Sequence, residues 1–307
     1  MRLSIGALIR LRRFQRLAFS PWSAPGPSKH IKIDDEERSV NSYSYDSPPN
    51  QQQDRSSFPI TRMILLALLA LLFMVLLLGY TLYKPPKFVI SYLRWKYPGV
   101  LFHIPLSNSH QVVALTIDDA PSGETARILD LLKIYHAKAT FFVIGGQVAA
   151  HPEIIQRIHD EGHELGNHAW ADEPSISLPL SELERQIKEV EALLPANHPI
   201  TGSKVSPKYF RPGSGFFNGQ MLQMARGLGY RVALGSIYPH DPQIHNARVN
   251  AKHVLSMARP GGIIIVHDRR SYSAAQIELI LGGLKKRKFR VESLGGLLGV
   301  AGINKPV

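Results

Sequence analysis

The chain has 307 residues, a hydrophobic composition of 44% and a formal net charge of +12. This much apolar sequence excludes a protein that is disordered throughout, and it can form one large domain or two ordinary ones. Because the chain has no cysteine, disulfides, zinc–cysteine sites and a thiol nucleophile are excluded, and any metal ion must be held by His, Asp or Glu.

The positive charge is spread along the chain. Residues 1–62 carry 10 Lys/Arg against 6 Asp/Glu, residues 63–110 carry 4 against 0, and residues 111–307 hold the remaining +4. A nucleic-acid-binding domain would concentrate its basic residues on one surface. The densest run, KKRKFR at 285–290, is interpreted as a solvated helix end, so no nucleic-acid partner is expected.

Residues 1–62 are expected to form a disordered tail. They are rich in Ser, Pro, Gln and Asn, as in SYSYDSPPNQQQDRSS, and such a composition buries too little apolar surface to offset the entropy of ordering the chain. The first 33 residues contain five Arg and no acidic residue. Mitochondrial transit peptides share that composition, which leaves a mitochondrial membrane as an alternative location.

The next segment, residues 63–83, is predicted to be a transmembrane helix. The twenty residues MILLALLALLFMVLLLGYTL carry no charge, and as a helix they span the roughly 30 Å hydrocarbon core of a bilayer. A buried core helix is the alternative, but such helices are shorter and rarely apolar on every face. Because a long tail precedes it, the segment is typical of an uncleaved signal anchor.

Charge does not settle the orientation of this helix. Two Arg precede the span closely, and four basic residues follow it: Lys84, Lys87, Arg94 and Lys96. This local bias opposes a lumenal C-terminal domain, but the complete tail holds ten basic residues, and long domains cross membranes largely regardless of charge. We expect a single-pass protein with a lumenal or extracellular C-terminal domain, preceded by a juxtamembrane linker over 84–110.

Short apolar runs alternate with helical segments over residues 111–300, before a short tail at 301–307. Strands are predicted at 112–117, 139–144, 163–168, 208–213, 231–237, 262–268 and 289–294. Helices are predicted at 124–136, 152–162 and near 181–194, where Ser181 and Glu184 have capping-box spacing. The alternation predicts an α/β fold, a mainly parallel sheet or barrel with its chemistry at the carboxyl ends of the strands.

Several predicted strands end on groups capable of chemistry. These groups are Asp118, Asp119, His168, Arg211 and His267, and in a barrel they would converge on one rim. Adjacent carboxylates raise each other's proton affinity unless a cation lies between them, so one of Asp118 and Asp119 can hold a metal while the other acts as a base. The alternative is that DDAPSGE only caps the next helix.

His168 and Asp172 lie four residues apart in GNHAWADEPS. On a helical turn both side chains would share one face and reach one ion, whereas an ordinary polar turn would need no metal. His267 ends the run GIIIVHD and places an imidazole where a general acid is required. Five other histidines are expected to be solvated or helix-capping groups: His151, His159, His163, His245 and His253.

Taken together, four stretches resemble the motifs of the polysaccharide deacetylases, the NodB-homology carbohydrate esterases. TIDDAP, NHAWAD, FRPGSG and IIIVHD are similar to that family's TFDDGP, His-Ser/Thr-x-x-His, Arg-Pro-Pro-Tyr-Gly and Leu-x-Leu-His motifs, in the same order. The resemblance implies a distorted (β/α) barrel of about seven parallel strands. It also implies metal-assisted removal of N-acetyl groups from glycan containing N-acetylglucosamine, either chitin-like or peptidoglycan-like.

The resemblance also implies a role for each matching residue. Asp118 would be the general base, Arg211 the residue that orients it, and His267 the general acid. Asp119, His168 and, at the second histidine position of the motif, Asp172 would hold the metal. The family implies zinc, whereas an Asp-His-Asp set favours harder ions and makes cobalt, manganese or nickel alternatives. A backbone N–H within residues 211–215 would help to bind the oxyanion.

Three positions depart from the family's pattern. Asp172 replaces a histidine, Ala120 replaces the motif glycine, and Tyr238 stands where an aspartate would pair with Arg211. His240 and Asp241 either supply replacement contacts or form a surface turn. The alternatives to a deacetylase are therefore a catalytically degenerate glycan-binding protein and an amidohydrolase of a small non-sugar substrate. The oligomeric state is left open.

Overall fold

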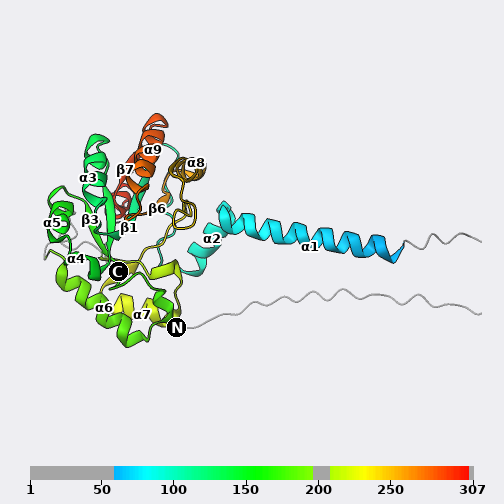
Figure 1. Cartoon of the computed structure of the whole chain (residues 1–307), viewed down its shortest axis with the longest axis horizontal. Coiled ribbons are helices and arrows are strands. Elements are labelled where there is room, and N and C mark those ends of the chain that lie inside the picture. The colour runs from blue at the N-terminus through cyan, green and yellow to red at the C-terminus, as the bar shows by residue number, and fades with distance from the viewer. Residues whose placement is uncertain (1–58, 196–207, 304–307) are drawn as a thin grey trace, which may run out of the picture. The chain divides into compact units, whose positions relative to one another are not determined.

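The computed structural model of the chain describes residues 59–195 and 208–303 (Figure 1). The predicted N-terminal tail lies outside these residues except for its last four positions, and most of the predicted tail at 301–307 also lies outside them. Helix α1 (Ile60–Tyr83) has 24 residues, none of them buried, and is long and apolar enough to cross a membrane. It begins three residues before the predicted span and therefore includes Arg62.

Seven parallel strands form one sheet, in the order β5-β4-β3-β2-β1-β6, with β7 paired to the start of β1. The strands are β1 (Val112–Ala120), β2 (Ala139–Val143), β3 (Glu164–Asn167), β4 (Lys208–Phe210), β5 (Tyr230–Val232), β6 (Ile263–His267) and β7 (Arg290–Glu292). After β5 the chain crosses to β6, where Ile237 forms a parallel bridge with Ile264. The predicted α/β fold with seven parallel strands is confirmed.

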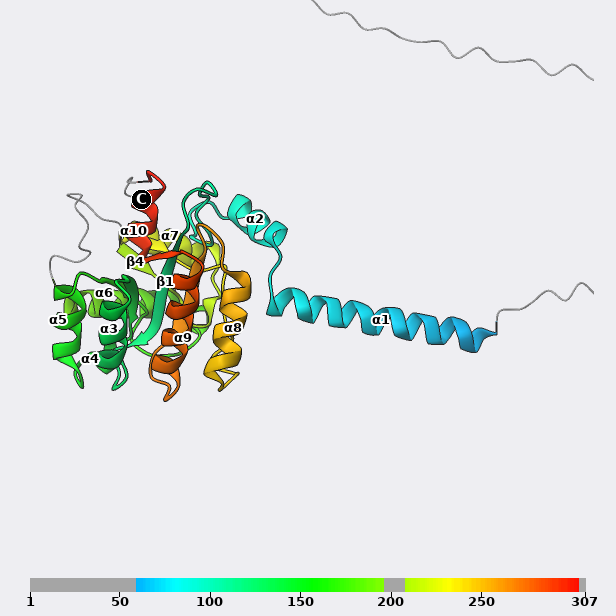
Figure 2. The ribbon, with the colours of Figure 1, turned by 90° about the horizontal axis from the view of Figure 1, so that it is seen from above.

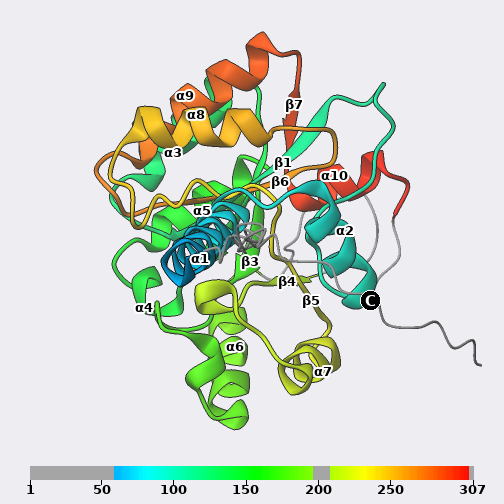
Figure 3. The same ribbon diagram turned by 90° about the vertical axis from the view of Figure 1, so that its right-hand side faces the viewer.

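Helices cover the outside of the sheet, and Figure 2 shows α5, α3, α9 and α8 in a row along it. In Figures 1 and 3, α6 and α7 lie on the side away from α8 and α9. The helices after α1 are α2 (Lys87–Lys96), α3 (Thr125–Ile134), α4 (Gly145–Val148), α5 (Pro152–Asp160), α6 (Leu180–Leu193), α7 (Gly219–Gly227), α8 (Ala247–Met257), α9 (Ser273–Lys286) and α10 (Leu294–Val300). Short 3-10 turns lie at Ser175–Ser177 and Gly213–Gly215.

Strand β1 explains why polar groups are buried at the rim, the edge of the sheet formed by the carboxyl ends of its strands. All nine of its residues are buried, as expected for a parallel strand covered on both faces. Its register places Asp118 beside His267 of β6, and Asn167 at the end of β3 pairs with Phe210 of β4. The carboxyl ends of β1, β3, β4 and β6 therefore meet at one edge of the sheet.

Three local expectations are wrong, one for Ser181 and two for histidines. Ser181 does not cap α6, because the helix begins at Leu180 and its N-cap, Pro179, makes no side-chain capping bond. His163 is not solvated but buried beside Phe141, and burial together with the positive charges of Lys138 and Arg157 lowers its pKa to about 3. His253 on α8 is also buried rather than solvated.

Residues 84–110 form part of the barrel rather than a free connection. This segment contains α2, and the residues that follow it bridge two strands, with Leu101 parallel to Ala233 and His103 antiparallel to Gly262. Leu101, Phe102 and Ile104 are buried. Apolar residues in this stretch thus complete the core beside the seam where β5 crosses to β6.

Candidate functional site

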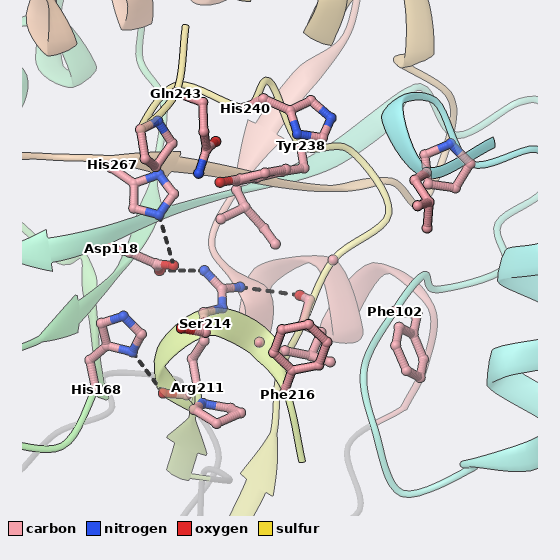
Figure 4. A pocket seen from close by; sticks show the side chains of 18 of the residues that line it. Phe102, Asp118, His168, Arg211, Ser214, Phe216, Tyr238, His240, Gln243 and His267 are labelled. Carbon is pink, nitrogen blue, oxygen red and sulfur yellow. Dashed lines mark hydrogen bonds and ion pairs between the residues drawn. The ribbon is translucent and has the colours of Figure 1, made fainter. Parts of the chain in front are cut away.

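Asp118 and Arg211 form a buried ion pair at the centre of the rim. Arg211 Nη1 donates to Asp118 Oδ1 at 2.5 Å and to Thr116 Oγ1 at 2.8 Å. The rest of the guanidinium donates to the carbonyl oxygens of Ala233 and Leu234. Burial lowers the pKa of Arg211, and the charge of Asp118 opposes that effect. Asp118 is therefore held in one position beside a permanent positive charge (Figure 4).

His267 faces the other oxygen of Asp118 and is positioned by Asp241. Its Nδ1 lies 2.8 Å from Asp241 Oδ1, its backbone N–H donates to Asp241 Oδ2 at 2.8 Å, and its Nε2 lies 4.0 Å from Asp118 Oδ2. Burial alone would lower the pKa of His267, but the hydrogen bond to Asp241 and the neighbouring carboxylates raise it to about 9. The imidazole is therefore protonated at neutral pH.

Asp241 is buried rather than part of a surface turn. Besides His267, it accepts a hydrogen bond from Gln276 Nε2 at 3.0 Å. The sequence suggested that Asp241 or His240 replaces a contact of Arg211, but Asp241 contacts His267, and His240 Nε2 donates to the carbonyl oxygen of Tyr83. The role of Asp241 in holding the imidazole was missed by sequence reasoning.

Asp119 and His168 form a second buried pair. Asp119 has a positive φ of 66°, a conformation that short polar side chains tolerate. His168 Nδ1 lies 2.7 Å from the carbonyl oxygen of Arg211, so Nδ1 donates and Nε2 carries the lone pair, 3.9 Å from Asp119 Oδ1. Burial raises the pKa of Asp119, although His267 and His168 oppose the rise.

These two residues fit a divalent metal ion. A histidine whose Nδ1–H is bound to a carbonyl, with Nε2 free, has the arrangement usual for metal-ligating imidazole. A cation beside the buried carboxylate of Asp119 would offset the burial that raises its pKa. Asp119 and His168 are therefore placed as ligands would be.

Asp172 does not lie beside Asp119 and His168 as a third ligand. The backbone over 168–174 is not helical, with bends at 170–173 and a positive φ at Ala169, so the helical turn expected for His168 and Asp172 is wrong. The Asp172 side chain is 46% exposed and accepts from Arg269 Nη2 at 2.5 Å. Across residues 59–195 and 208–303, no three His, Asp or Glu side chains converge to hold a metal ion.

Arg269 lies between the two acidic groups of this region. Its Nη2 is 3.4 Å from Asp119 Oδ2 as well as 2.5 Å from Asp172, and Arg270 Nη2 is 4.0 Å from Asp119 Oδ2. The positive charge of an arginine thus stands where a metal ligand set needs a cation. Sequence reasoning missed Arg269, and the available signal was two arginines directly after His267 and Asp268.

Asp268, the other carboxylate at the end of β6, has a structural role. It is fully buried and accepts from Ser122 Oγ at 2.7 Å and from Thr125 Oγ1. Asp268 therefore ties the end of β6 to the start of α3 and does not face the cavity.

Tyr238 does not replace the aspartate that would pair with Arg211. Its ring lies 5.9 Å from the ring of His267 and 4.6 Å from that of His240, and no hydrogen bond joins it to the guanidinium among the contacts of the described residues. Burial and the charges of Asp241 and Asp118 raise the pKa of Tyr238, so the phenol stays neutral. Among the residues that the structure describes, Asp118 is the one ion-pair partner of Arg211.

A cavity of about 780 Å³ connects these groups to the surface. Asp118, Asp119, His168 and His267 line its polar end, and Ser214 and Tyr238 border it (Figure 4). The arrangement can hold a polarised carbonyl between a carboxylate base and an imidazolium acid. Such geometry suits hydrolysis of an amide.

Known proteins share both the sequence pattern and the fold. Residues 106–233 match the family model for polysaccharide deacetylase. A peptidoglycan-N-acetylglucosamine deacetylase from Bacillus cereus is 31% identical over 220 residues, which cover 68% of this chain and 93% of the relative. Some relatives are longer, and the chain spans 41% of a Listeria monocytogenes deacetylase.

Solved structures agree. The peptidoglycan deacetylase PdaC from Bacillus subtilis is 31% identical, with a TM-score of 0.56 over 64% of this chain and 93% of that one. A mutant of a CE4 family pseudoenzyme from Bacillus anthracis, described as having restored enzymatic activity, is 26% identical. Its TM-score is 0.57 over 65% of this chain and 71% of that one.

Proposed function

The chain belongs to the polysaccharide deacetylase family, and we propose that it removes N-acetyl groups from glycan containing N-acetylglucosamine, chitin-like or peptidoglycan-like. The observation that supports this most strongly is the position of Asp118. One of its oxygens is 2.5 Å from Arg211 Nη1, the other is 4.0 Å from His267 Nε2, and both groups line one cavity. These distances support the roles of base, orienting residue and acid that the family's motifs imply for Asp118, Arg211 and His267.

In the proposed reaction a water molecule adds to the acetamide carbon, the C–N bond breaks, acetate leaves and the amine takes up a proton. Asp118 accepts the proton of the water, and Arg211 holds that carboxylate in position. His267 is protonated at neutral pH because of Asp241. Its Nε2–H donates the proton to the departing amine.

Asp119 and His168 would hold a divalent metal, with zinc expected from the family and cobalt, manganese or nickel as alternatives. When bound, such an ion polarises the acetamide carbonyl and acidifies water. Asp172 would join the ligand set only after leaving Arg269. The motif residues supply two donors directly, and the third requires a change of partner.

The amide of Ser214 is the candidate oxyanion donor. In residues 211–215, the N–H groups of Arg211, Gly213 and Gly215 donate within the fold, and Pro212 has none. Ser214 lines the cavity with a positive φ of 62°. Its backbone N–H is the one we propose to stabilise the negative charge that develops on the carbonyl oxygen.

A glycan-binding protein without turnover is the second candidate function. It is favoured by Arg269, which already bonds Asp172 and approaches Asp119 at 3.4 Å. Such an arginine can neutralise the acidic region without a metal ion. A pseudoenzyme is described among the family's solved structures, which gives this candidate a precedent.

We further propose that α1 anchors the domain in a membrane in a single pass, with the barrel on the lumenal or extracellular side. The proposal is supported by the length and composition of α1, all of whose residues are unburied. No nucleic-acid partner is expected. A glycan substrate would then be available on the same side as the barrel.

Acetate release from chitooligosaccharide by the full chain in detergent tests the proposed function. Metal would be stripped, then zinc, cobalt, manganese and nickel restored one at a time. Release that a metal restores and that Asp119→Ala abolishes supports a metal-dependent deacetylase. A folded protein that binds the glycan but neither binds metal nor releases acetate would instead support the non-catalytic candidate.

A further inference from the structure

The cavity is chemically two-sided. Opposite the acidic and imidazole groups, its wall is apolar, and much of that wall comes from the last turn of the membrane-length helix and the segment that follows it: Leu82, Pro85, Val89, Ile90, Leu93 and Phe102. Aliphatic side chains offer no hydrogen bonds to sugar hydroxyls, and burying hydroxyls against them costs free energy. One end of the cavity therefore suits an acetamide, and the other suits hydrocarbon.

The end of α1 contacts residues at and near the cavity. The Tyr83 ring stacks on His240 at 5.0 Å, His240 Nε2 donates to the Tyr83 carbonyl at 2.9 Å, and Lys84 Nζ lies 3.0 Å from Ser256 Oγ. Only residues 84–86 separate α1 from α2, a length of at most about 11 Å. With α1 in a bilayer, the cavity cannot reach glycan far from the membrane surface.

Helix α2 presents different faces to the cavity and to solvent. Val89, Ile90 and Leu93 line the cavity, and Ile90 is buried in an apolar cluster with Phe210. Phe88, Tyr92 and Trp95, at i, i+4 and i+7, are instead exposed, Phe88 by 72% and Trp95 by 77%.

All the charged residues on α2 and in the segment around it are basic. Lys87, Arg94 and Lys96 lie on the helix itself, and residues 84–103 contain no acidic residue. Exposed aromatic and basic side chains beside a membrane span are typical of a helix that lies in the interface of an anionic bilayer. The same helix would thus contact lipid with one face and the substrate with the other.

We infer that the cavity takes an N-acetylated amino sugar carried on a membrane lipid through a phosphate or diphosphate. Its acetamide lies between Asp118 and His267, and the lipid end of the molecule lies along the apolar wall. The inference rests on the proposed deacetylase function and specifies its substrate class. Arg270, which lines the cavity, supplies a positive charge for the phosphate, and the apolar wall complements the first part of the hydrocarbon chain.

The test compares two substrates with the full chain reconstituted in vesicles of phosphatidylcholine and phosphatidylglycerol. One substrate is N-acetylglucosamine on polyprenyl diphosphate, and the other is a soluble chitooligosaccharide. Val89→Ser removes apolar surface from the wall of the cavity. Val249→Ser is the matched control, because Val249 is exposed on α8 and does not line the cavity.

We expect kcat/KM for the lipid-linked sugar to exceed that for the soluble glycan by at least about tenfold. We expect Val89→Ser to reduce that ratio about tenfold, mainly through KM, as loss of one apolar contact predicts. Val249→Ser should leave kcat/KM unchanged for both substrates. Equal use of the two substrates, or an equal effect of Val89→Ser on both, would overturn the inference while leaving the deacetylase proposal intact.

Failure to hydrolyse either substrate would refute the deacetylase proposal, and a binding measurement then decides the inference separately. Radiolabelled lipid-linked sugar is titrated into the same vesicles. Binding that Val89→Ser weakens and Val249→Ser does not would retain the lipid-linked ligand for a non-catalytic protein. Absence of binding to the wild type would overturn the inference as well.

Discussion

The two halves of the rim differ in how their charges are held. In the half proposed to transfer protons (the proton-transfer half), Asp118 is paired with Arg211 through a buried hydrogen bond, and His267 is paired with Asp241 through a partly buried one. In the half proposed to hold a metal ion (the metal half), Asp119 and His168 are buried and 3.9 Å apart, but Asp172 is half exposed and paired with Arg269. The first half is already arranged for chemistry, whereas the second requires a side chain to change its partner.

This difference follows from where each residue sits. Asp118, Arg211 and His267 lie at or directly after strands whose registers are fixed by neighbouring strands. Asp172 lies in a loop of bends after β3, and Arg269 lies in the turn before α9. Positions fixed by strands keep their geometry, whereas loop positions can exchange contacts at lower cost.

Asp118→Asn should have the largest effect, because it removes the base from the half that is already arranged. We expect kcat for acetate release to fall roughly 10²- to 10⁴-fold. The free energy of unfolding should also fall, by up to about 3–5 kcal/mol, because Arg211 is left buried without a counter-charge. Steady-state kinetics and urea unfolding measure the two effects.

Asp130→Asn is the control, since the exposed Asp130 pairs only with Arg157 among the described residues. It should leave kcat unchanged and should change the free energy of unfolding by no more than about 1 kcal/mol. An Asp118→Asn variant with wild-type turnover would show that another group accepts the proton.

Asp241→Asn should have the second largest effect, through the pKa of His267. Because the acid must be protonated, wild-type activity should persist through neutral pH and fall as the pH rises through about 9. Without the Asp241 carboxylate, burial lowers the pKa of His267, so this alkaline limb should move to lower pH. At pH 8 we expect kcat to fall roughly 10- to 100-fold.

The pH profile of kcat separates this effect from a loss of folding. Asp160→Asn provides the matched control, because Asp160 is exposed at the end of α5 and bonds only to Gln156 among the described residues. An alkaline limb that stays in place in Asp241→Asn would assign the limb to a group other than His267.

Arg269→Met tests the metal half. Removing the guanidinium frees Asp172 and takes a positive charge away from Asp119. The affinity for zinc should therefore rise about tenfold, or about 1.4 kcal/mol. Isothermal titration of the metal-stripped protein measures this change without relying on turnover.

Arg248→Met removes an equal charge from an exposed position on α8 and should leave zinc affinity unchanged. If Arg269→Met weakens or does not alter metal binding, the arginine does not compete with the ion. The difference between the two halves of the rim would then not come from competition between Arg269 and the ion.

The fold was predictable from the sequence because buried strands and amphipathic helices leave periodic patterns, and β1 and β6 were located within a few residues. The proton-transfer half was also predictable, since Asp118, Arg211 and His267 stand at strand ends. Asp241 and Arg269 could not be placed, because their contacts cross between loops far apart in sequence. No local spacing encodes such contacts. Residues 84–110 were missed as a wall of the cavity for the same reason.

Tyr238→Phe should have the smallest effect. The phenol is neutral and makes no bond to Arg211 among the contacts of the described residues, so losing its hydroxyl removes no counter-charge. We expect kcat to change less than about threefold, which corresponds to loss of one minor hydrogen bond.

Tyr135→Phe is the control, because Tyr135 is a half-buried tyrosine beside Gly282 and outside the cavity. A fall of more than about tenfold in Tyr238→Phe alone would show that the hydroxyl contacts the substrate or the base. The proton-transfer half would then depend on a residue beyond its two ion pairs.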